Sequence, residues 1–387
     1  MVFLTISTRG GRPARNISNS PGTASVIPKV IRLPGAQIVL VTWIEQTPAQ
    51  STIWFAKSLD NGVTWSTPTQ ETNSGQILSG NWENDFNCYS IDYDDSVLHM
   101  VYQLRQNEND DFEIVYARST DLAQSWHIVR TITTNATDSI YPDVAARGEY
   151  VHITYQDSWP GNPDIMYKRI NDYGMGSTDL SRRLTSSAGD SLYPRIAVSA
   201  DGTILNVAYE EDVPNKNHQI FLTTIRDNGS GTFFCQQLTW GTDWNGLPDI
   251  EPSTGAETEY FYIVYNTLQH GNREIMYKRL DNWCIPPYNT YTVRLTYSDT
   301  ESYCTSIAFD GTYNNIHITY HDNLPGNNEV YYRKFLDYGG GGYTGTRICW
   351  TSGDSINATV ASSGAWPHIV WSDSTSGNYE IYWKYGY

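Results

Sequence analysis

Acidic side chains recur two residues after an aromatic residue, in a phrase that repeats along the chain. The phrase is clearest at 152–169, HITYQDSWPGNPDIMYKR, and it returns at 317–334 and at 368–385. Five copies carry a carboxylate at this position: Glu45, Asp157, Glu211, Asp322 and Asp373. Such carboxylates could form a ring near the mouth of a channel and bind a cation or a hydroxylated ligand. They could instead accept N–H bonds from their own loops, and repetition in step with the loop favours this structural role.

Tryptophans in the connections between strands are the second group of candidates. Trp159 lies inside a repeat, whereas Trp82, Trp240, Trp244 and Trp350 lie between repeats. Exposed indoles beside Asn, Asp and Gly suit sugars, whose C–H faces stack on the ring, although each indole could equally pack on a neighbouring unit. The candidate ligand-binding residues are therefore Trp82, Trp159, Trp240, Trp244, Trp350, Asp157, Asp322 and Asp373.

Histidines occur in two settings. Four of them stand three residues before the repeated aromatic residue: His99, His152, His317 and His368. Because repeats of this kind fan apart, we expect these four to be hydrogen-bonded strand residues and not ligands of one metal. His321, beside Asp322, is the histidine that a polysaccharide lyase could use as a base, together with a Tyr or Arg partner.

The cysteines give no sign of a metal site. Cys88, Cys235, Cys284, Cys304 and Cys349 are scattered without CxxC spacing, which argues against structural zinc. We expect no metal site and no cofactor; a structural calcium ion is compatible with the sequence, but no motif indicates one. The odd number leaves the disulfide pairing open.

The spacing of the repeats predicts the fold. The aromatic residues that close the second strand of each unit are Trp43, Tyr102, Tyr155, Tyr209, Tyr265, Tyr320 and Trp371, which are 51 to 59 residues apart. Four short strands fit in each unit, a pattern typical of propeller blades. We therefore expect residues 1–387 to form one all-β domain, a seven-bladed β-propeller of four-stranded antiparallel blades.

The ends of the chain suggest how the ring closes. The last copy stops after its third strand at Tyr387, and Phe3-Leu4-Thr5-Ile6 stands alone before the first unit. An N-terminal strand that completes the last blade would remove the exposed edge of an open array. We expect Phe3–Ile6 to be that strand.

Charge and hydropathy limit the classes of partner that the chain can bind. The chain has 42 acidic and 25 basic residues and a net charge of −17, which disfavours nucleic acid and anionic membrane surfaces. No apolar run is long enough to span a bilayer. The start shows no basic region followed by an apolar core, so we expect no signal peptide in this chain.

The connection between third and fourth strands carries a recognisable motif. Ser58 to Trp65 reads SLDNGVTW and fits S-x-D-x-G-x-T-W, and Ser119 to Trp126 is a close variant. With the repeated phrase, this chain resembles the BNR/Asp-box repeat proteins related to sialidases. The resemblance implies a propeller of mostly secreted or surface proteins, some of which cleave glycans while many only bind them.

The resemblance also implies where a sialidase site should be, and the sequence departs from it. Sialidases carry an arginine in an F-R-I-P motif on the first strand, whereas Val26-Ile27-Pro28-Lys29 keeps only the proline. Tyr193-Pro194-Arg195-Ile196 has an arginine, but in another order and in a middle blade. Sialidases are also six-bladed, and fold alone does not fix function.

These observations favour a non-catalytic recognition or surface module that binds carbohydrate through its loop face. The first alternative is a glycan-cleaving enzyme, either a sialidase-like hydrolase or a polysaccharide lyase. The second is an architectural domain that binds other surface proteins. A cluster of Arg, His and carboxylates in one pocket would favour the enzyme. In each case we expect an extracellular or cell-surface location.

Overall fold

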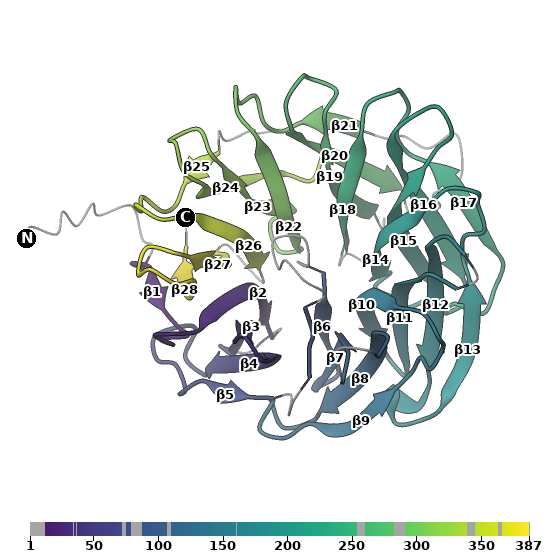
Figure 1. Cartoon of the computed structure of the whole chain (residues 1–387), viewed down its shortest axis with the longest axis horizontal. Helices are drawn as coiled ribbons and strands as arrows, with labels where there is room; N and C mark the ends of the chain where they lie inside the picture. Colours follow the sequence, from purple (N-terminus) through teal and green to yellow (C-terminus); the bar gives the residue numbers. More distant parts are fainter. Residues whose placement is uncertain are drawn as a thin grey trace, which may run out of the picture.

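The computed structural model describes residues 12–33, 35, 37–71, 75–78, 87–106, 110–159, 161–253, 260–281, 291–338, 345–362 and 366–386. These form seven four-stranded antiparallel sheets, with no α-helix among the described residues. The sheets stand as blades around a common centre (Figure 1). The predicted seven-bladed all-β propeller is confirmed.

Each of the first three blades runs in chain order from its innermost to its outermost strand. Blade 1 contains β2 (Ala24–Arg32), β3 (Val39–Gln46), β4 (Ser51–Ser58) and β5 (Thr69–Gln70). Blade 2 contains β6 (Tyr89–Asp94), β7 (Val97–Leu104), β8 (Glu113–Ser119) and β9 (His127–Thr131). Blade 3 contains β10 (Ser139–Arg147), β11 (Tyr150–Asp157), β12 (Asp164–Ile170) and β13 (Thr178–Arg183), with the 3₁₀ turn η1 (Asp172–Gly174) before its last strand.

The remaining blades repeat this plan, except that the last one borrows its outer strand. Blade 4 contains β14 (Ser191–Val198), β15 (Ile204–Asp212), β16 (His218–Arg226) and β17 (Phe233–Gln237). Blade 5 contains β18 (Asn245–Pro252), β19 (Tyr260–Thr267), β20 (Glu274–Asp281) and β21 (Tyr291–Arg294). Blade 6 contains β22 (Ser302–Asp310), β23 (Asn315–Asp322), β24 (Glu329–Leu336) and β25 (Thr346–Arg347). Blade 7 contains β26 (Ser355–Ala361), β27 (His368–Asp373), β28 (Glu380–Tyr385) and β1 (Arg15–Asn16).

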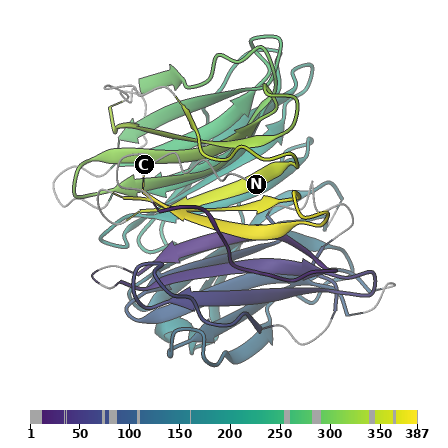
Figure 2. The same ribbon diagram turned by 90° about the vertical axis from the view of Figure 1, so that its left-hand side faces the viewer.

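The ring closes through β1, which pairs antiparallel with β28. In the side view of Figure 2 the last blade, in yellow, lies between the purple first blade and the green sixth blade. Beyond β1, Ile17 is buried, and the Ser18 hydroxyl donates a 2.5 Å hydrogen bond to Glu380. The predicted closure by an N-terminal strand is therefore confirmed.

The residues of the closing strand differ from those expected. Phe3–Ile6 lies outside the described residues, and the strand that pairs with β28 is Arg15–Asn16. The segment 15–18, RNIS, places an aliphatic residue and then a hydroxyl where 183–185, RLT, has them. Thr185 accepts a 2.8 Å bond from Ile165 N–H, just as Ser18 accepts one of 2.9 Å from the N–H of Ile381. The hydroxyl at the end of the outer strand thus makes the same hydrogen bond in both blades.

The hydrophobic core consists of clusters between adjacent blades. One such cluster joins Val101 and Tyr116 of blade 2 to Ile153 and Tyr155 of blade 3. Because a blade in the ring has a neighbour on both sides, its middle strands are buried on both faces, as in β11. Burial of these aromatic and branched side chains supplies most of the stabilisation of the ring.

In several blades, a bulge in the innermost strand directs one residue toward the central channel. Tyr141, Tyr193 and Leu247 each have a positive φ of 52–53° and each precede a proline. The pairing of β10, β14 and β18 with the next strand slips by one residue here, as expected for a bulge. The residue after each proline then lies in the central channel, where Arg195 and Asp249 meet.

The SLDNGVTW segment forms a compact turn between β4 and β5. Asp60 accepts bonds from the Thr64 N–H at 2.8 Å and from its hydroxyl at 2.6 Å. Gly62 has a φ of +81°, and a Cβ there would lie 2.0 Å from the Trp383 ring. Trp65 packs edge-on against Trp383 at 5.4 Å. The motif therefore joins blade 1 to blade 7.

Candidate active site

The repeated carboxylates stabilise the loops of their own blades. Asp157 accepts bonds from the Ser139 hydroxyl at 3.0 Å and from the Trp159 N–H at 2.8 Å. Asp322 and Asp373 do the same with the serine that begins the first strand and with the second residue after the carboxylate. All three are buried. These contacts account for the repetition, and ligand binding by these residues stays a prediction.

The predicted tryptophans lie in different places. Trp159, Trp240 and Trp350 are exposed, with 59%, 63% and 64% of their surface open to solvent. Trp244 instead lines a cavity, and Trp82 lies outside the described residues. The structure therefore does not bring the five candidates together. A sugar-binding role for each of them stays a prediction.

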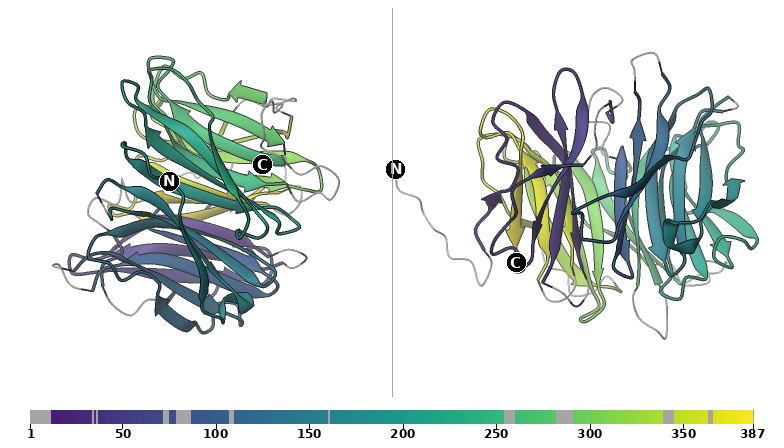
Figure 3. Two further views of the ribbon diagram at one scale, coloured as in Figure 1. Left: turned by 90° about the vertical axis from the view of Figure 1, so that its right-hand side faces the viewer. Right: turned by 90° about the horizontal axis from the view of Figure 1, so that it is seen from below.

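A cavity of about 660 Å³ opens between blades 4 and 7 on the face that carries the connections between successive blades. We call it the loop-face cavity. Its polar and aromatic lining includes Glu210, His218, Trp244, Arg273, Glu301, Tyr303, His321, Asp354 and Asn357. Figure 3 shows the strands running between two opposite faces where the loops gather. The cavity is large enough for more than one sugar ring.

Arg273, just before β20, is held between two aromatic rings. Its guanidinium carbon lies 4.7 Å from the ring centroid of Trp244 and 4.3 Å from that of Tyr303. Glu301 Oε2 lies 3.7 Å from Nε, which has no hydrogen-bond partner among the described residues. Stacking on both faces fixes the plane of the cation and leaves its edge for hydrogen bonds.

Glu210 and His218 form a pair at the blade 4 side of the cavity. Glu210 Oε2 lies 3.0 Å from His218 Nδ1, and Oε1 accepts a 2.6 Å bond from Leu247 N–H. The pair needs a glycine opposite, since a Cβ on Gly246 would lie 2.5 Å from Glu210 Oε1. The hydrogen bond to Glu210 raises the pKa of His218, against the opposing effect of burial. His218 is thus favoured in its protonated form.

His321 and Tyr303 face each other at the blade 6 side. Their rings are nearly parallel, at an angle of 6° with centroids 5.0 Å apart. Burial lowers the pKa of His321 to about 4, and the charge of Arg273 acts in the same direction while Asp322 opposes it. Its Nδ1 is buried and has no hydrogen-bond partner among the described residues. His321 is therefore neutral near neutral pH and can accept a proton.

The lining residues occupy positions at which the blades differ. The residue after the second-strand aromatic is, in blade order, Ile44, Gln103, Gln156, Glu210, Asn266, His321 and Ser372. The residue two before the third-strand Ile or Val is Ser51, Phe112, Pro163, His218, Arg273, Asn328 and Tyr379. Residues that can transfer protons or carry charge therefore gather in blades 4 to 6.

The sequence analysis singled out Trp244 and His321 but missed Glu210, His218, Arg273 and Tyr303, because it followed the positions that the blades share. A comparison of the variable positions would have found them.

The four histidines that precede the repeated aromatic residue are structural. His99, His152 and His317 each approach the hydroxyl of a tyrosine on the next strand of their own blade at 2.7–2.8 Å. His368 approaches Trp383 Nε1 at 3.2 Å. Burial lowers the pKa of His99, His317 and His368 to about 3. All four are hydrogen-bonded strand residues, and His368 Nε2 also lies 3.0 Å from Asn61 Oδ1 of the neighbouring blade 1.

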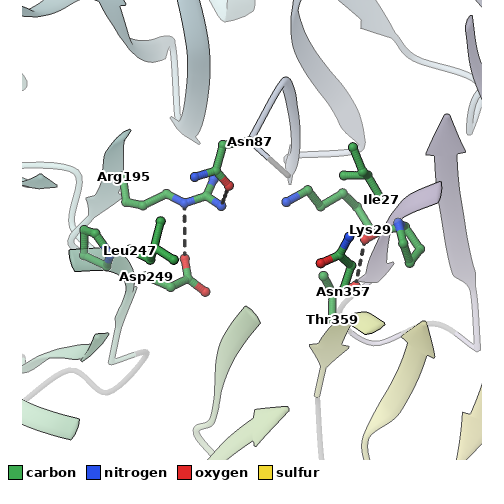
Figure 4. Close-up of a pocket in the computed structure, with 10 residues that line it drawn as sticks. Ile27, Lys29, Asn87, Arg195, Leu247, Asp249, Asn357 and Thr359 are labelled. Carbon is green, nitrogen blue, oxygen red and sulfur yellow. Dashed lines mark hydrogen bonds and ion pairs between the residues drawn. The ribbon is translucent and has the colours of Figure 1, made fainter. Parts of the chain in front are cut away.

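A smaller pocket lies on the central axis beside the loop-face cavity and shares Leu247 and Asn357 with it. Arg195 lies 3.8 Å from Asp249 and also bonds to Asn87, while Lys29 extends toward it from the opposite wall (Figure 4). Burial lowers the pKa of Lys29 to about 8, and the charge of Arg195 adds to this effect. With a volume of about 30 Å³ this pocket is too small for a sugar.

In the part of the chain that the structure describes, no group of three or more His, Cys, Asp or Glu side chains is arranged to hold a metal ion. Among the same residues, no helix has the length and apolar character that crossing a membrane requires.

Comparison with known proteins adds the fold relationship. No protein-family model matches the chain, and neither does any curated protein sequence. The GH93 α-L-arabinofuranosidase of Fusarium graminearum, solved with arabinobiose, is similar with a TM-score of 0.56 and 10% identity, over 97% of each chain. An α-L-arabinanase of Penicillium chrysogenum, also solved with arabinobiose, gives 0.54 and 13%, over 84% of this chain and 98% of that one. The phage phi92 endosialidase gives 0.54 and 11%, over 97% and 69%.

The chain has a propeller of sialidase-like fold. This finding corrects the expectation of a non-catalytic module, because the similar structures are glycan-cleaving enzymes. The expectation relied on the missing F-R-I-P arginine, which concerns sialidase chemistry alone. Other chemistry can be built on the same fold.

Proposed function

We propose that this chain is a glycan-cleaving enzyme whose active site is the loop-face cavity. The observation that carries the proposal is the gathering of Glu210, His218, Arg273 and His321 in one cavity and at positions where the blades differ. A purely structural role would repeat from blade to blade, as the loop carboxylates do. A site that breaks a bond needs groups of this kind, unique and close together.

The environments of the two histidines support the proposal. Cleavage of a glycosidic bond requires one group that gives a proton and another that takes one. The hydrogen bond to Glu210 raises the pKa of His218, while burial lowers the pKa of His321 to about 4. Titratable groups whose surroundings push their pKa values apart are the pattern expected of an acid and a base. Trp244 and Tyr303 flank Arg273 and hold its guanidinium at the cavity.

The proposal also includes the relationship of this chain to other propeller proteins and its location relative to the cell. The hydrogen bonds of Asp60 and the packing of Trp65 support kinship with Asp-box repeat proteins. An enzyme that acts on polymeric glycans would work outside the cell or at its surface, where such polymers are found.

The proposal can be tested with a panel of neutral and acidic polysaccharides and an assay for new reducing ends. We expect the wild-type protein to release reducing ends from at least one polymer, and the His321→Gln variant to be slower by about 100-fold. His270→Gln is the matched control, because His270 is exposed on a loop between β19 and β20 and does not line the cavity. If no polymer yields reducing ends, or if both variants lose activity equally, the proposal is wrong.

A further inference from the structure

Three side chains stand in order across the loop-face cavity. His218 belongs to blade 4, Arg273 to blade 5 and His321 to blade 6. Arg273 lies between Trp244 and Tyr303, and Tyr303 in turn stacks on His321. The cation is therefore central, with one histidine on each side.

From this arrangement we propose that the enzyme cleaves uronic-acid-containing glycans by β-elimination. Arg273 binds the uronate carboxylate, His321 removes the proton from C5, and His218 protonates the leaving oxygen at C4. The inference rests on the proposed function, since it specifies the substrate class and the reaction at the same site.

Arg273 suits a carboxylate ligand better than a neutral sugar. A planar guanidinium matches the two oxygens of a carboxylate, and the rings on both faces hold it in place. Its neighbour Glu301 has a side chain that is 40% exposed and lies 3.7 Å away, longer than a hydrogen bond. A pair this open is weak, so a substrate carboxylate can displace Glu301. Neutralising that carboxylate makes the C5 proton easier to remove.

His321 is placed to act as the base because its ring lines the cavity and is only half-buried. Its Nδ1 is buried without a hydrogen-bond partner among the described residues, so the nitrogen that would take the proton is Nε2. The charged groups that act on the ring are Asp322, on its own strand, and Arg273, from the neighbouring blade. A bound uronate would offset the charge of Arg273 and so strengthen His321 as a base when substrate is present.

His218 has the opposite character. Its Nδ1 faces Glu210, which leaves Nε2 as the nitrogen available to a leaving group. Glu210, Asp212 and Asp190 are the charged groups that favour its protonated form. It can therefore give a proton to the departing oxygen.

The step balances without water, metal or oxidant. His321 takes the C5 proton, and the C–H electron pair forms the double bond between C4 and C5. The bond from C4 to the glycosidic oxygen breaks, and that oxygen takes its proton from His218 and leaves as a hydroxyl. The histidines end in exchanged protonation states, which solvent resets.

The carboxylates of the loop-face cavity are less well placed for hydrolysis by a pair of carboxyl groups. That reaction needs one carboxyl group to act on the glycosidic oxygen and another to act as nucleophile or base. Both oxygens of Glu210 are engaged, by Leu247 N–H and by His218. Glu301 is close to Arg273 and also accepts a 3.2 Å bond from its N–H.

The test measures two products of one digestion. Polygalacturonate, alginate and chondroitin sulfate are the acidic substrates, and debranched arabinan is the neutral one. We expect new reducing ends from an acidic polymer and an equal molar amount of unsaturated uronate, detected by its ultraviolet absorbance. Reducing ends without this absorbance, or cleavage of arabinan alone, would overturn the inference and leave the proposed function intact. The absence of new reducing ends from every polymer would contradict both the inference and the proposed function.

A variant of the cation separates binding of the carboxylate from a structural role. We expect Arg273→Gln to lower kcat/KM on the cleaved acidic polymer by about 100-fold. Its loss on the methyl-esterified form of that polymer should be at least tenfold smaller, because the ester gives Arg273 no charge to bind. An equal loss on both forms would contradict the assignment.

Discussion

His317 and His321 lie on the same strand, β23, and have opposite surroundings. His317 Nδ1 is 2.7 Å from the Tyr332 hydroxyl, whereas His321 lines the loop-face cavity and its buried Nδ1 has no partner among the described residues. The first repeats in other blades, and the second does not. At the scale of residues, side chains that repeat from blade to blade stabilise the fold, whereas side chains unique to one blade form the proposed active site.

The acid role of His218 gives a prediction in pH. Because the hydrogen bond to Glu210 raises the pKa of His218, the Glu210→Gln variant should have a His218 of lower pKa. The protonated form is then lost at lower pH, so the alkaline side of the pH–rate profile should move toward acid. A profile measured over the full pH range of stability checks this. An unchanged alkaline side, with activity retained, would show that His218 is not the acid.

At the scale of elements, the loop after the outer strand carries an aromatic residue in three neighbouring blades. Trp240, Tyr297 and Trp350 each follow an aliphatic residue and a Thr or Cys, and all three are exposed. A basic side chain lies over each ring, at 4.4–6.0 Å from its centroid. The blades that carry them are those that form the cavity. That these rings hold a polymer on the same face is a prediction.

This placement predicts a difference between long and short substrates. The Trp240→Ala, Trp350→Ala double variant should raise KM for a polymer several-fold, because each stacked sugar contributes about 1 kcal/mol. The KM for a short oligosaccharide that fills only the cavity should stay the same. Tyr173→Ala is the control, since Tyr173 is exposed on the opposite face, in η1 between third and fourth strands. Equal KM values for the polymer in both variants would contradict the binding role.

The closing strand gives a prediction of stability. Ile17 is buried in the cluster that joins blades 7 and 1. Replacing it with alanine should lower the free energy of unfolding by about 2–5 kcal/mol. Arg15→Ala, which changes an exposed side chain of β1 itself, should cost much less. Chemical denaturation of both variants measures the difference, and equal values would argue against closure through this segment.

At the scale of the whole molecule, the central channel brings acidic groups together. Burial, aided by Asp249 and Asp92, raises the pKa of Glu251 to about 8, and burial raises the pKa of Asp92 to about 6. Such carboxyls stay protonated in the fold and ionise in the unfolded chain. The folded state therefore binds more protons in this window, and stability falls as pH rises.

This linkage can be measured as a melting temperature. From about pH 4.5 to about pH 8, the wild-type protein should lose stability as Glu251 ionises in the unfolded chain alone. Glu251→Gln should lose less over the same window, since the amide cannot ionise. A steeper fall in the variant than in the wild type would contradict the buried, protonated state.

The fold was predictable from the sequence because each blade repeats its own hydrogen bonds and core. The closing strand was misplaced because Phe3–Ile6 is more apolar than the segment 15–18, whose pattern nevertheless matches the outer strands. The site was harder to predict because Glu210, Arg273 and Tyr303 come together only where three blades meet. Each looks ordinary within its own repeat.

The most direct test of the central claim is a crystal structure of His321→Gln with an oligosaccharide from the cleaved polymer. We predict a sugar ring in the loop-face cavity, with its carboxylate at the Arg273 guanidinium. An oligosaccharide bound only over Trp240 and Trp350, with nothing in the loop-face cavity, would contradict the account.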